Sequence, residues 1–193
     1  MTTELTIRTK RLELVAATIT AVVAELSGRE ALVSHLSVEV PASWPPGEYD
    51  RDALEFFGGK LEAAVPEEHG WYNWYVMSLV GAERHSLVAG AGYLGPPSSD
   101  GVVEIGYSVV PEARGQGYAT EIVQALVAHA FESPAVLLVI AHTHESNAAS
   151  SSVLSRCGFQ LVGSATADGN TLYEHLGARP PNPSLQHTRF ARR

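Results

Sequence analysis

The order of hydrophobic and polar positions predicts several strands before residue 111. Residues 9–17, TKRLELVAA, alternate in polarity and predict a first strand with Leu12 and Leu14 on one face. Three more strand-like runs follow, with short connections between them: residues 71–80, 86–95 and 101–110. Successive strands with short connections are typical of an antiparallel meander, so this part of the chain predicts an antiparallel sheet.

Apolar residues at helical spacing predict the helices. Residues 19–37 show this spacing with an interruption at SGRE, which predicts two short helices, and Asp50 or Asp52 is expected to cap a helix over residues 50–64. Beyond residue 110 the pattern predicts a helix, a buried strand, a second helix and a final pair of strands, at residues 120–133, 135–143, 146–159, 159–165 and 170–177. This order of elements indicates a mixed α/β sheet.

Composition limits the class of protein. A length of 193 residues, 45% hydrophobic and 18% charged, predicts one folded domain, which we expect over residues 1–178 with an irregular tail at 179–193. The net charge of −8 opposes binding to nucleic acid and favours a cationic partner such as an amine.

The cellular setting is also predicted from composition. The single Cys157 cannot form an internal disulfide. The first residues lack the apolar stretch of a secretory signal, and the longest apolar run, residues 135–141, is too short to span a bilayer. The sequence therefore predicts a cytoplasmic protein with no membrane partner.

The segment PEARGQGYATE, residues 111–121, is the strongest candidate for chemistry. The chain here leaves a strand and enters a helix, so the first helical amides lack intrahelical acceptors and favour an anion. Gly115 and Gly117 leave backbone accessible to a ligand, and Arg114 adds a positive charge suited to phosphate. No Gly-Lys-Ser/Thr follows, which excludes a Walker loop, and the glycine spacing differs from the dinucleotide fingerprint. The alternative is a turn with a solvated arginine.

Three segments resemble the GNAT acetyltransferase superfamily. Residues 114–119, RGQGYA, match its Arg/Gln-x-x-Gly-x-Gly/Ala pattern. The block from Asn147 to Phe159 and the opening TKRLEL are similar to the branch that acetylates the N-termini of ribosomal proteins. The resemblance spans residues 8–176; Ser155 and Arg156 depart from that branch's usual Glu-Lys, and residues 35–75 carry no matching motif. It implies the GNAT fold, a mostly antiparallel central sheet of about seven strands with a splayed parallel pair, flanked by helices.

The resemblance also implies the cosubstrate, acetyl-coenzyme A, and the residues that hold it. Backbone groups of Val109 and Val110 would meet the pantetheine arm, the Val109 amide would stabilise the oxyanion, and Asn147 would contact the same arm while capping its helix. The residues expected around the pyrophosphate are Arg114, Gly115, Gln116, Gly117, Tyr118, Ala119 and Thr120.

Two residues are expected to act in acetyl transfer to an amine. By the resemblance, Glu104 would take the proton of the amine, and Ser150 would assist the departing thiolate. Each also has a structural interpretation, as a solvent-facing strand residue and as a serine at a helix N-terminus. No metal is expected, because His142 and His144 lack further ligands at recognisable spacing, and Cys157 is expected to be a buried helix residue rather than a nucleophile.

The acceptor and the assembly are left open by the sequence. The acceptor is expected to be a protein N-terminus or a small amine, and the loop around Trp44 is a candidate wall for its pocket. A non-catalytic module that senses acyl-coenzyme A is the alternative function. We expect no nucleic-acid partner, and a homodimer is predicted from the exposed strand edge of the sheet.

Overall fold

The computed structural model describes residues 5–47, 49–80, 83–163 and 169–177. An eight-stranded sheet has the order β1-β2-β3-β4-β5-β6-β8-β7. The strands are β1 Thr6–Arg8, β2 Leu12–Ala16, β3 Asn73–Val80, β4 Glu83–Tyr93, β5 Val102–Val109, β6 Leu138–His144, β7 Gln160–Leu161 and β8 Asn170–Leu176. Only β5 and β6 pair parallel, and every other neighbouring pair is antiparallel. The predicted mixed, mostly antiparallel sheet with one parallel pair is therefore confirmed; it has eight strands where about seven were expected.

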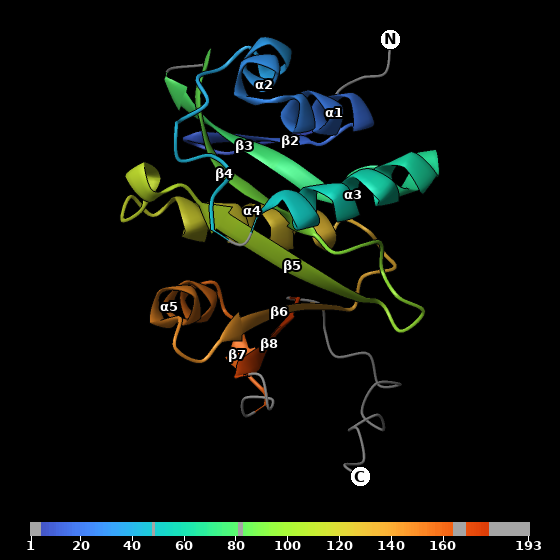
Figure 1. Ribbon diagram of the computed structural model, residues 1–193. Coiled ribbons are helices and arrows are strands. Elements are labelled where there is room, and N and C mark those ends of the chain that lie inside the picture. The colour runs from blue at the N-terminus through green and yellow to red at the C-terminus, as the bar shows by residue number, and fades with distance from the viewer. Residues whose placement is uncertain (1–4, 48, 81–82, 164–168, 178–193) are drawn as a thin grey trace.

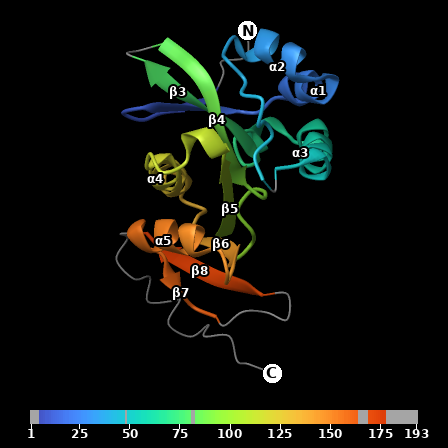
Figure 2. The ribbon, with the colours of Figure 1, turned by 60° about the vertical axis from the view of Figure 1, so that its left-hand side comes forward.

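Helices cover both faces of the sheet (Figures 1 and 2). The helices are α1 Ile19–Ser27, α2 Arg29–Leu36, α3 Arg51–Ala63, α4 Tyr118–Ala130 and α5 Ala148–Arg156, with short 3-10 turns at Pro66–Glu68 and Pro111–Ala113. One apolar core joins α1, α2 and α3 to Val15, Tyr75 and Met77. The other joins α4 and α5 to the opposite face of the same strands. Successive side chains along each strand therefore pack into two separate apolar cores, one on each face of the sheet.

Local sequence signals account for the ends of several helices. Asp50 caps α3 by accepting a hydrogen bond from the amide of Ala53, as predicted. The break expected at SGRE lies at Gly28, which separates α1 from α2 with φ of +123°. Asn147 caps α5 by accepting from the amide of Ser150, which confirms the predicted cap.

The first predicted strand begins later than its sequence pattern indicates. β2 starts at Leu12, because Thr9 forms a turn in which its amide donates to the carbonyl of Leu12 and its hydroxyl accepts from the amide of Leu12. The shorter β1 precedes this turn and forms one edge of the sheet. Thr9 and Arg11 of this turn bond to Glu121 on α4.

The sheet opens between β5 and β6. Their pairing is limited to Val102–Glu104 with Leu138–Ile140, and β5 continues to Val109 without β6 beside it. Figure 1 shows the two strands diverging from this point, with α5 on the side of β6. The splayed parallel pair implied by the resemblance is present, and it leaves one side of the β5 backbone open.

Not all of the segments expected from the sequence lie within the described residues. The expected tail, residues 179–193, and part of the expected strand at residues 159–165 lie outside the described residues. Within the residues that are described, no helix is long and apolar enough to cross a membrane.

Candidate functional site

The backbone of β5 alternates between groups bound to β4 and groups that face the opening. The carbonyl of Glu104 accepts from the amide of Leu94, and the amide of Val110 donates to the carbonyl of Val88. Since backbone groups alternate along a strand, the amides of Tyr107 and Val109 point the other way, toward β6. The Val109 amide therefore faces the opening, whereas the Val110 amide is already paired with β4.

The loop after β5 presents backbone amides at the start of α4. Gly115 and Gly117 have φ of +75° and +80°, the left-handed region that favours glycine. Gly117 is the N-cap of α4, and no side-chain cap hydrogen bond among the described residues satisfies the first amides of this helix. The first amides of α4, from Tyr118, Ala119 and Thr120, thus lack an intrahelical acceptor. Gln116 is exposed, and its side-chain nitrogen Nε2 donates to the carbonyl of Glu112. The result is a cationic and amide-rich helix start that fits an anion.

Arg114 connects this loop to the end of β5. Its Nε donates to the carbonyl of Val109 at 3.0 Å, and the residue is exposed. The bond uses one of the guanidinium's five donors and leaves the others to a ligand. Arg114 therefore lies between the opening and the start of α4.

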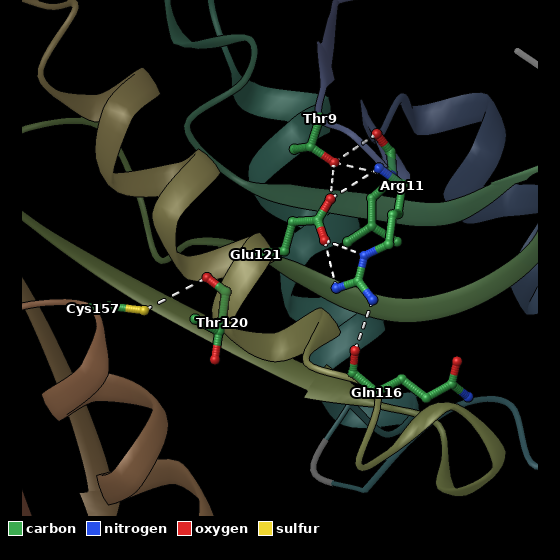
Figure 3. A network of polar contacts seen from close by, with 7 residues as sticks. Thr9, Arg11, Gln116, Thr120, Glu121 and Cys157 are labelled. Carbon is green, nitrogen blue, oxygen red and sulfur yellow. Dashed lines mark hydrogen bonds and ion pairs between the residues drawn. The ribbon is translucent and has the colours of Figure 1, made fainter. Parts of the chain in front are cut away.

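A network that sequence reasoning did not assign to the site fixes this loop from the other side (Figure 3). Arg11 donates through Nε to Glu121 Oε2 at 2.7 Å and through Nη1 to the carbonyl of Gln116 at 2.8 Å. The Thr9 hydroxyl and the Arg11 amide both donate to Glu121 Oε1. Burial alone would raise the pKa of Glu121, but these hydrogen bonds and the Arg11 charge outweigh it and lower that pKa. The opening segment TKRLEL, which contains Thr9 and Arg11, was the sequence signal that could have identified this network.

A cavity of about 510 Å³ lies beside this network, between the turn at residues 9–11 and α4. Gly117, Thr120 and Lys10 are among its lining residues. Lys10 adds positive charge next to the start of α4, whereas the charge of Arg11 is balanced by Glu121, which lines the same cavity.

Glu104 meets His142 across the last pairs of β5 and β6. Its Oε1 lies 2.8 Å from His142 Nδ1, and the two side chains are 27% and 40% exposed. Glu104 lies on the face of β5 that carries Gly106 and Ser108, opposite the α4 core reached by Val103 and Ile105. Both residues are therefore accessible on the α3 face. The sequence pattern of β5 did not decide which face Glu104 occupies.

Ser150 meets a tyrosine that the sequence did not single out. Its Oγ lies 2.8 Å from the hydroxyl of Tyr107 on β5. Burial raises the pKa of Tyr107 to about 12, so this hydroxyl stays protonated at neutral pH and can donate. Tyr107 thus ties the first turn of α5 to the strand that borders the opening.

A cavity of about 540 Å³ lies next to these groups. Arg114 and Asn147 line it beside the opening, and Tyr107, Ser108 and Gly106 line it along β5. On the α3 face it reaches β4, β3, the loop before α3 and α3 itself, where its lining residues include Gly90, Gly92, Asn73, Tyr49 and Phe57. The cavity extends from Arg114 and Asn147 over the α3 face, and Glu104, Val109 and Ser150 are not among the described residues that line it.

The remaining candidates occupy supporting positions. The indole of Trp44 donates to Glu25 Oε1 at 2.5 Å from the same loop that supplies Gly47 and Tyr49 to the cavity lining, so it braces this wall. Cys157 is half-buried, with Sγ 3.6 Å from the carbonyl of Thr120, and burial raises the pKa of its thiol. That shift disfavours the thiolate a nucleophile requires.

The two histidines of β6 do not converge. His142 bonds to Glu104, whereas His144 Nδ1 lies 2.7 Å from the hydroxyl of Ser146. No group of three or more His, Cys, Asp or Glu residues suited to a metal ion occurs within the described ranges.

Comparisons with known proteins agree with this arrangement. A profile of the acetyltransferase (GNAT) domain matches residues 11–160. The uncharacterized N-acetyltransferase YjdG of Bacillus subtilis is 26% identical over 129 residues, which is 67% of this chain and 74% of that protein.

Two solved structures show the same fold. The ribosomal-protein-S5-alanine acetyltransferase from Vibrio fischeri superposes with a TM-score of 0.62 at 17% identity, covering 92% of this chain and 100% of that one. RimL, a ribosomal L7/L12 alpha-N-protein acetyltransferase solved in complex with coenzyme A, superposes with a TM-score of 0.61 at 18% identity, covering 89% and 98% of the two chains.

Proposed function

The chain belongs to the GNAT acetyltransferase family, and from this premise we propose that it transfers the acetyl group of acetyl-coenzyme A directly to an amine. The amine nitrogen attacks the thioester carbonyl carbon, a carbon–nitrogen bond forms, and the carbon–sulfur bond breaks to release coenzyme A. The reaction needs an anion site for the phosphates, an oxyanion donor, an acceptor for the amine proton and a donor for the thiolate.

The start of α4 would hold the pyrophosphate. The loop from Arg114 to Gly117 and the first turn of α4 provide amide donors without a side-chain cap, and Arg114 adds a charge able to pair with phosphate. Arg11 would act as a positioning residue, because it holds the Gln116 carbonyl and Glu121 at once.

The opening between β5 and β6 would take the pantetheine arm and the acetyl group. The Val109 amide faces this opening and serves as the oxyanion donor, whereas the Val110 amide is bound to β4. Asn147 lines the same cavity and would contact the arm through atoms its cap bond does not use.

Glu104 would remove the proton from the attacking amine. It lies on the α3 face, two residues along β5 from Gly106, which lines the cavity. His142 fixes the orientation of the carboxylate through its Nδ1 and provides a route for the proton toward solvent, since it is 40% exposed.

Ser150 and Tyr107 would act on the sulfur side. The Tyr107 and Ser150 hydroxyls lie 2.8 Å apart and either can donate; with Tyr107 as the donor, Ser150 would direct its own proton toward the departing thiolate. The serine thereby stabilises the developing negative charge without itself being a strong acid.

A single cavity carries the proposal. It brings Arg114 and Asn147, expected on the cosubstrate side, into one space with Gly106, Ser108 and Tyr49 on the opposite face of the sheet. Two substrates arriving from opposite faces would therefore meet at the end of β5. A protein N-terminus and a small amine both fit this arrangement, and the related S5-alanine acetyltransferase acts on a ribosomal protein, as its name states.

Calorimetric titration with acetyl-coenzyme A tests the proposal, using the wild type and an Arg114→Ala, Gly117→Val double variant. Valine is strained at the φ of +80° found at Gly117, and alanine removes the charge. We expect binding that the double variant loses, followed by release of free thiol when amines are added. Absence of binding to the wild type would overturn the proposal, and binding without turnover of any amine would favour the acyl-coenzyme A sensor instead.

A further inference from the structure

Gly106, Gly92 and Asn73 form an open path, here called the lane, across the α3 face from β5 to β3. Asn73 on β3 is paired with Gly92 on β4, and Gly92 is paired with Gly106 on β5. All three residues line the larger cavity, and neither glycine carries a side chain that would block the path between Asn73 and β5. Two strand spacings separate Asn73 from β5, which is about 10 Å. Asn73 therefore lies at the far end of the acceptor side.

A chain of buried hydrogen bonds fixes the orientation of the Asn73 amide. Asn73 Nδ2 donates to the Tyr49 hydroxyl at 2.6 Å, and that hydroxyl makes a longer contact of 3.4 Å to Glu25 Oε2. The Tyr75 hydroxyl donates to the same oxygen at 2.6 Å, and Trp44 donates to Oε1. Burial, with the Glu25 charge as the next cause, raises the pKa of Tyr49, so this hydroxyl keeps its proton. Its proton points to Glu25, and its lone pair accepts from Asn73.

This direction leaves the carbonyl end of Asn73 for a ligand. Asn73 is 3% exposed, yet its Oδ1 has no hydrogen-bond partner within the part of the chain that the structure describes. Oδ1 is not among the fully buried polar atoms without a partner, so this oxygen is open to the cavity, where an N–H donor from a ligand would bind it.

We propose that Asn73 Oδ1 binds an N–H donor on the acceptor, an ammonium or an amide, held about two strand spacings from the amine that is acetylated. The inference rests on the proposed function for the identity of the reacting end. It defines the substrate class as amines that carry a second nitrogen donor at the far end, and it excludes amines that end in a carboxylate.

The charges around the lane agree with this class. Among the described residues that line this cavity, Arg114 is the only lysine or arginine, and it lies at the opposite end, beside the opening. The carboxyl of Glu25 lies behind Tyr49, and the chain as a whole carries a net charge of −8. A terminal carboxylate would be repelled by the Oδ1 dipole and by these negative charges. An N–H donor would be attracted by both.

Four amines of matched length separate the possibilities. Hexylamine ends in a methyl group, hexamethylenediamine in an ammonium, ε-aminocaproamide in an amide and ε-aminocaproate in a carboxylate. Calorimetry of each against the protein saturated with coenzyme A measures binding without requiring turnover. We expect the diamine and the amide amine to bind about tenfold or more tightly than hexylamine, as one well-made buried hydrogen bond allows, and the carboxylate to bind weakest.

Variants at Asn73 and at its hydrogen-bond partner Tyr49 sharpen the test. Asn73→Leu should bring the four affinities together. Tyr49→Phe should free the amide to turn and present its nitrogen, which raises the affinity of ε-aminocaproate relative to ε-aminocaproamide. A loss of packing alone would not reverse that order. Ser78→Ala, at another buried polar residue of β3, is the control and should leave the order unchanged.

The outcomes distinguish this inference from the proposed function. Equal affinity of hexylamine and the two donor-ended amines for the wild type would overturn the role of Asn73, whether or not any of them is acetylated. Acetylation of hexylamine alongside that result would leave the proposed function intact. The expected order of affinities without thiol release would support the Asn73 site and count against the enzyme.

Discussion

Glu104 Oε1 on β5 and His142 Nδ1 on β6 lie 2.8 Å apart. The contact lies next to the last paired residues of the two strands, Glu104 and Ile140, so it closes the narrow end of the opening. A carboxylate bonded to one imidazole nitrogen has a fixed orientation and keeps its other oxygen for a substrate. The Glu104–His142 pair thus lies where β5 and β6 separate.

Replacing Glu104 by glutamine should lower kcat by about 100-fold or more, because the amide cannot accept the amine proton. His142→Ala should have a smaller effect on kcat, since it changes the orientation of Glu104 and not the base itself. Steady-state kinetics measure both variants, and calorimetry with acetyl-coenzyme A should give unchanged binding. A Glu104→Gln enzyme with wild-type kcat would remove Glu104 from the mechanism.

Ser150→Ala should lower kcat by about tenfold, the effect of one lost hydrogen bond to a developing charge. Tyr107→Phe should lower it less, because Tyr107 acts through Ser150. The double variant should resemble Ser150→Ala alone, which a double-mutant cycle on kcat measures. Strictly additive effects would show that the two hydroxyls act independently.

Gly106→Ala should obstruct the acceptor and leave the fold unchanged. The added methyl carbon would have only the Leu94 Cδ1 within 4 Å, at 3.8 Å, so the substitution fits without strain. Because Gly106 lines the cavity on the acceptor side, we expect a higher KM for the amine with unchanged affinity for acetyl-coenzyme A. Kinetics with the amine varied, compared with thermal unfolding, provide the measurement. A raised KM for acetyl-coenzyme A alone would place Gly106 on the other substrate's path.

Glu121 should contribute stability that depends on pH. Its pKa is lowered by folding from an ordinary value of 4.5, so this stability is present above that value and is lost as pH falls through the folded pKa. Glu121→Gln should therefore unfold about 1–3 kcal/mol more easily than the wild type at pH near 7, with a smaller difference in acid. Urea unfolding at both pH values tests this, and a difference that grows in acid would contradict it.

Arg11→Ala should weaken the same network and also the loop it supports. Arg11 bonds to both Glu121 and the Gln116 carbonyl, so its removal should reduce the affinity for acetyl-coenzyme A as well as the stability. Arg51→Ala is a matched control, because its ion pair with Glu55 is exposed on α3 and away from the loop. Equal losses of affinity in both variants would argue against a positioning role for Arg11.

Glu25 should show the opposite pH dependence. Burial raises its pKa above 4.5 although Tyr75, Trp44 and Tyr49 all donate to it. The folded state then holds the proton more tightly, so the contribution to stability is full below 4.5 and declines as pH rises through the folded pKa. The stability of the wild type relative to Glu25→Gln should therefore fall as pH rises above 4.5, in urea unfolding followed by fluorescence. A constant difference across this range would show that the Glu25 pKa is not raised.

Much of the architecture was determined by the sequence itself. The alternation in β3, β4 and β5, the helical spacing in α4 and α5, and the caps at Asp50 and Asn147 are local signals, because each depends on residues a few positions apart. The glycines at 115 and 117 likewise marked a backbone whose positive φ can be inferred from residue type and spacing.

Only the tertiary structure decided which of these residues meet. Glu104 and His142 are 38 positions apart, Tyr107 and Ser150 are 43 apart, and Arg11 and Glu121 are 110 apart. Their contacts depend on strand register and on the order of strands in the sheet, which no periodicity along the chain contains. The lane on the α3 face is the clearest case, since Asn73, Gly92 and Gly106 form it only because three strands place them side by side.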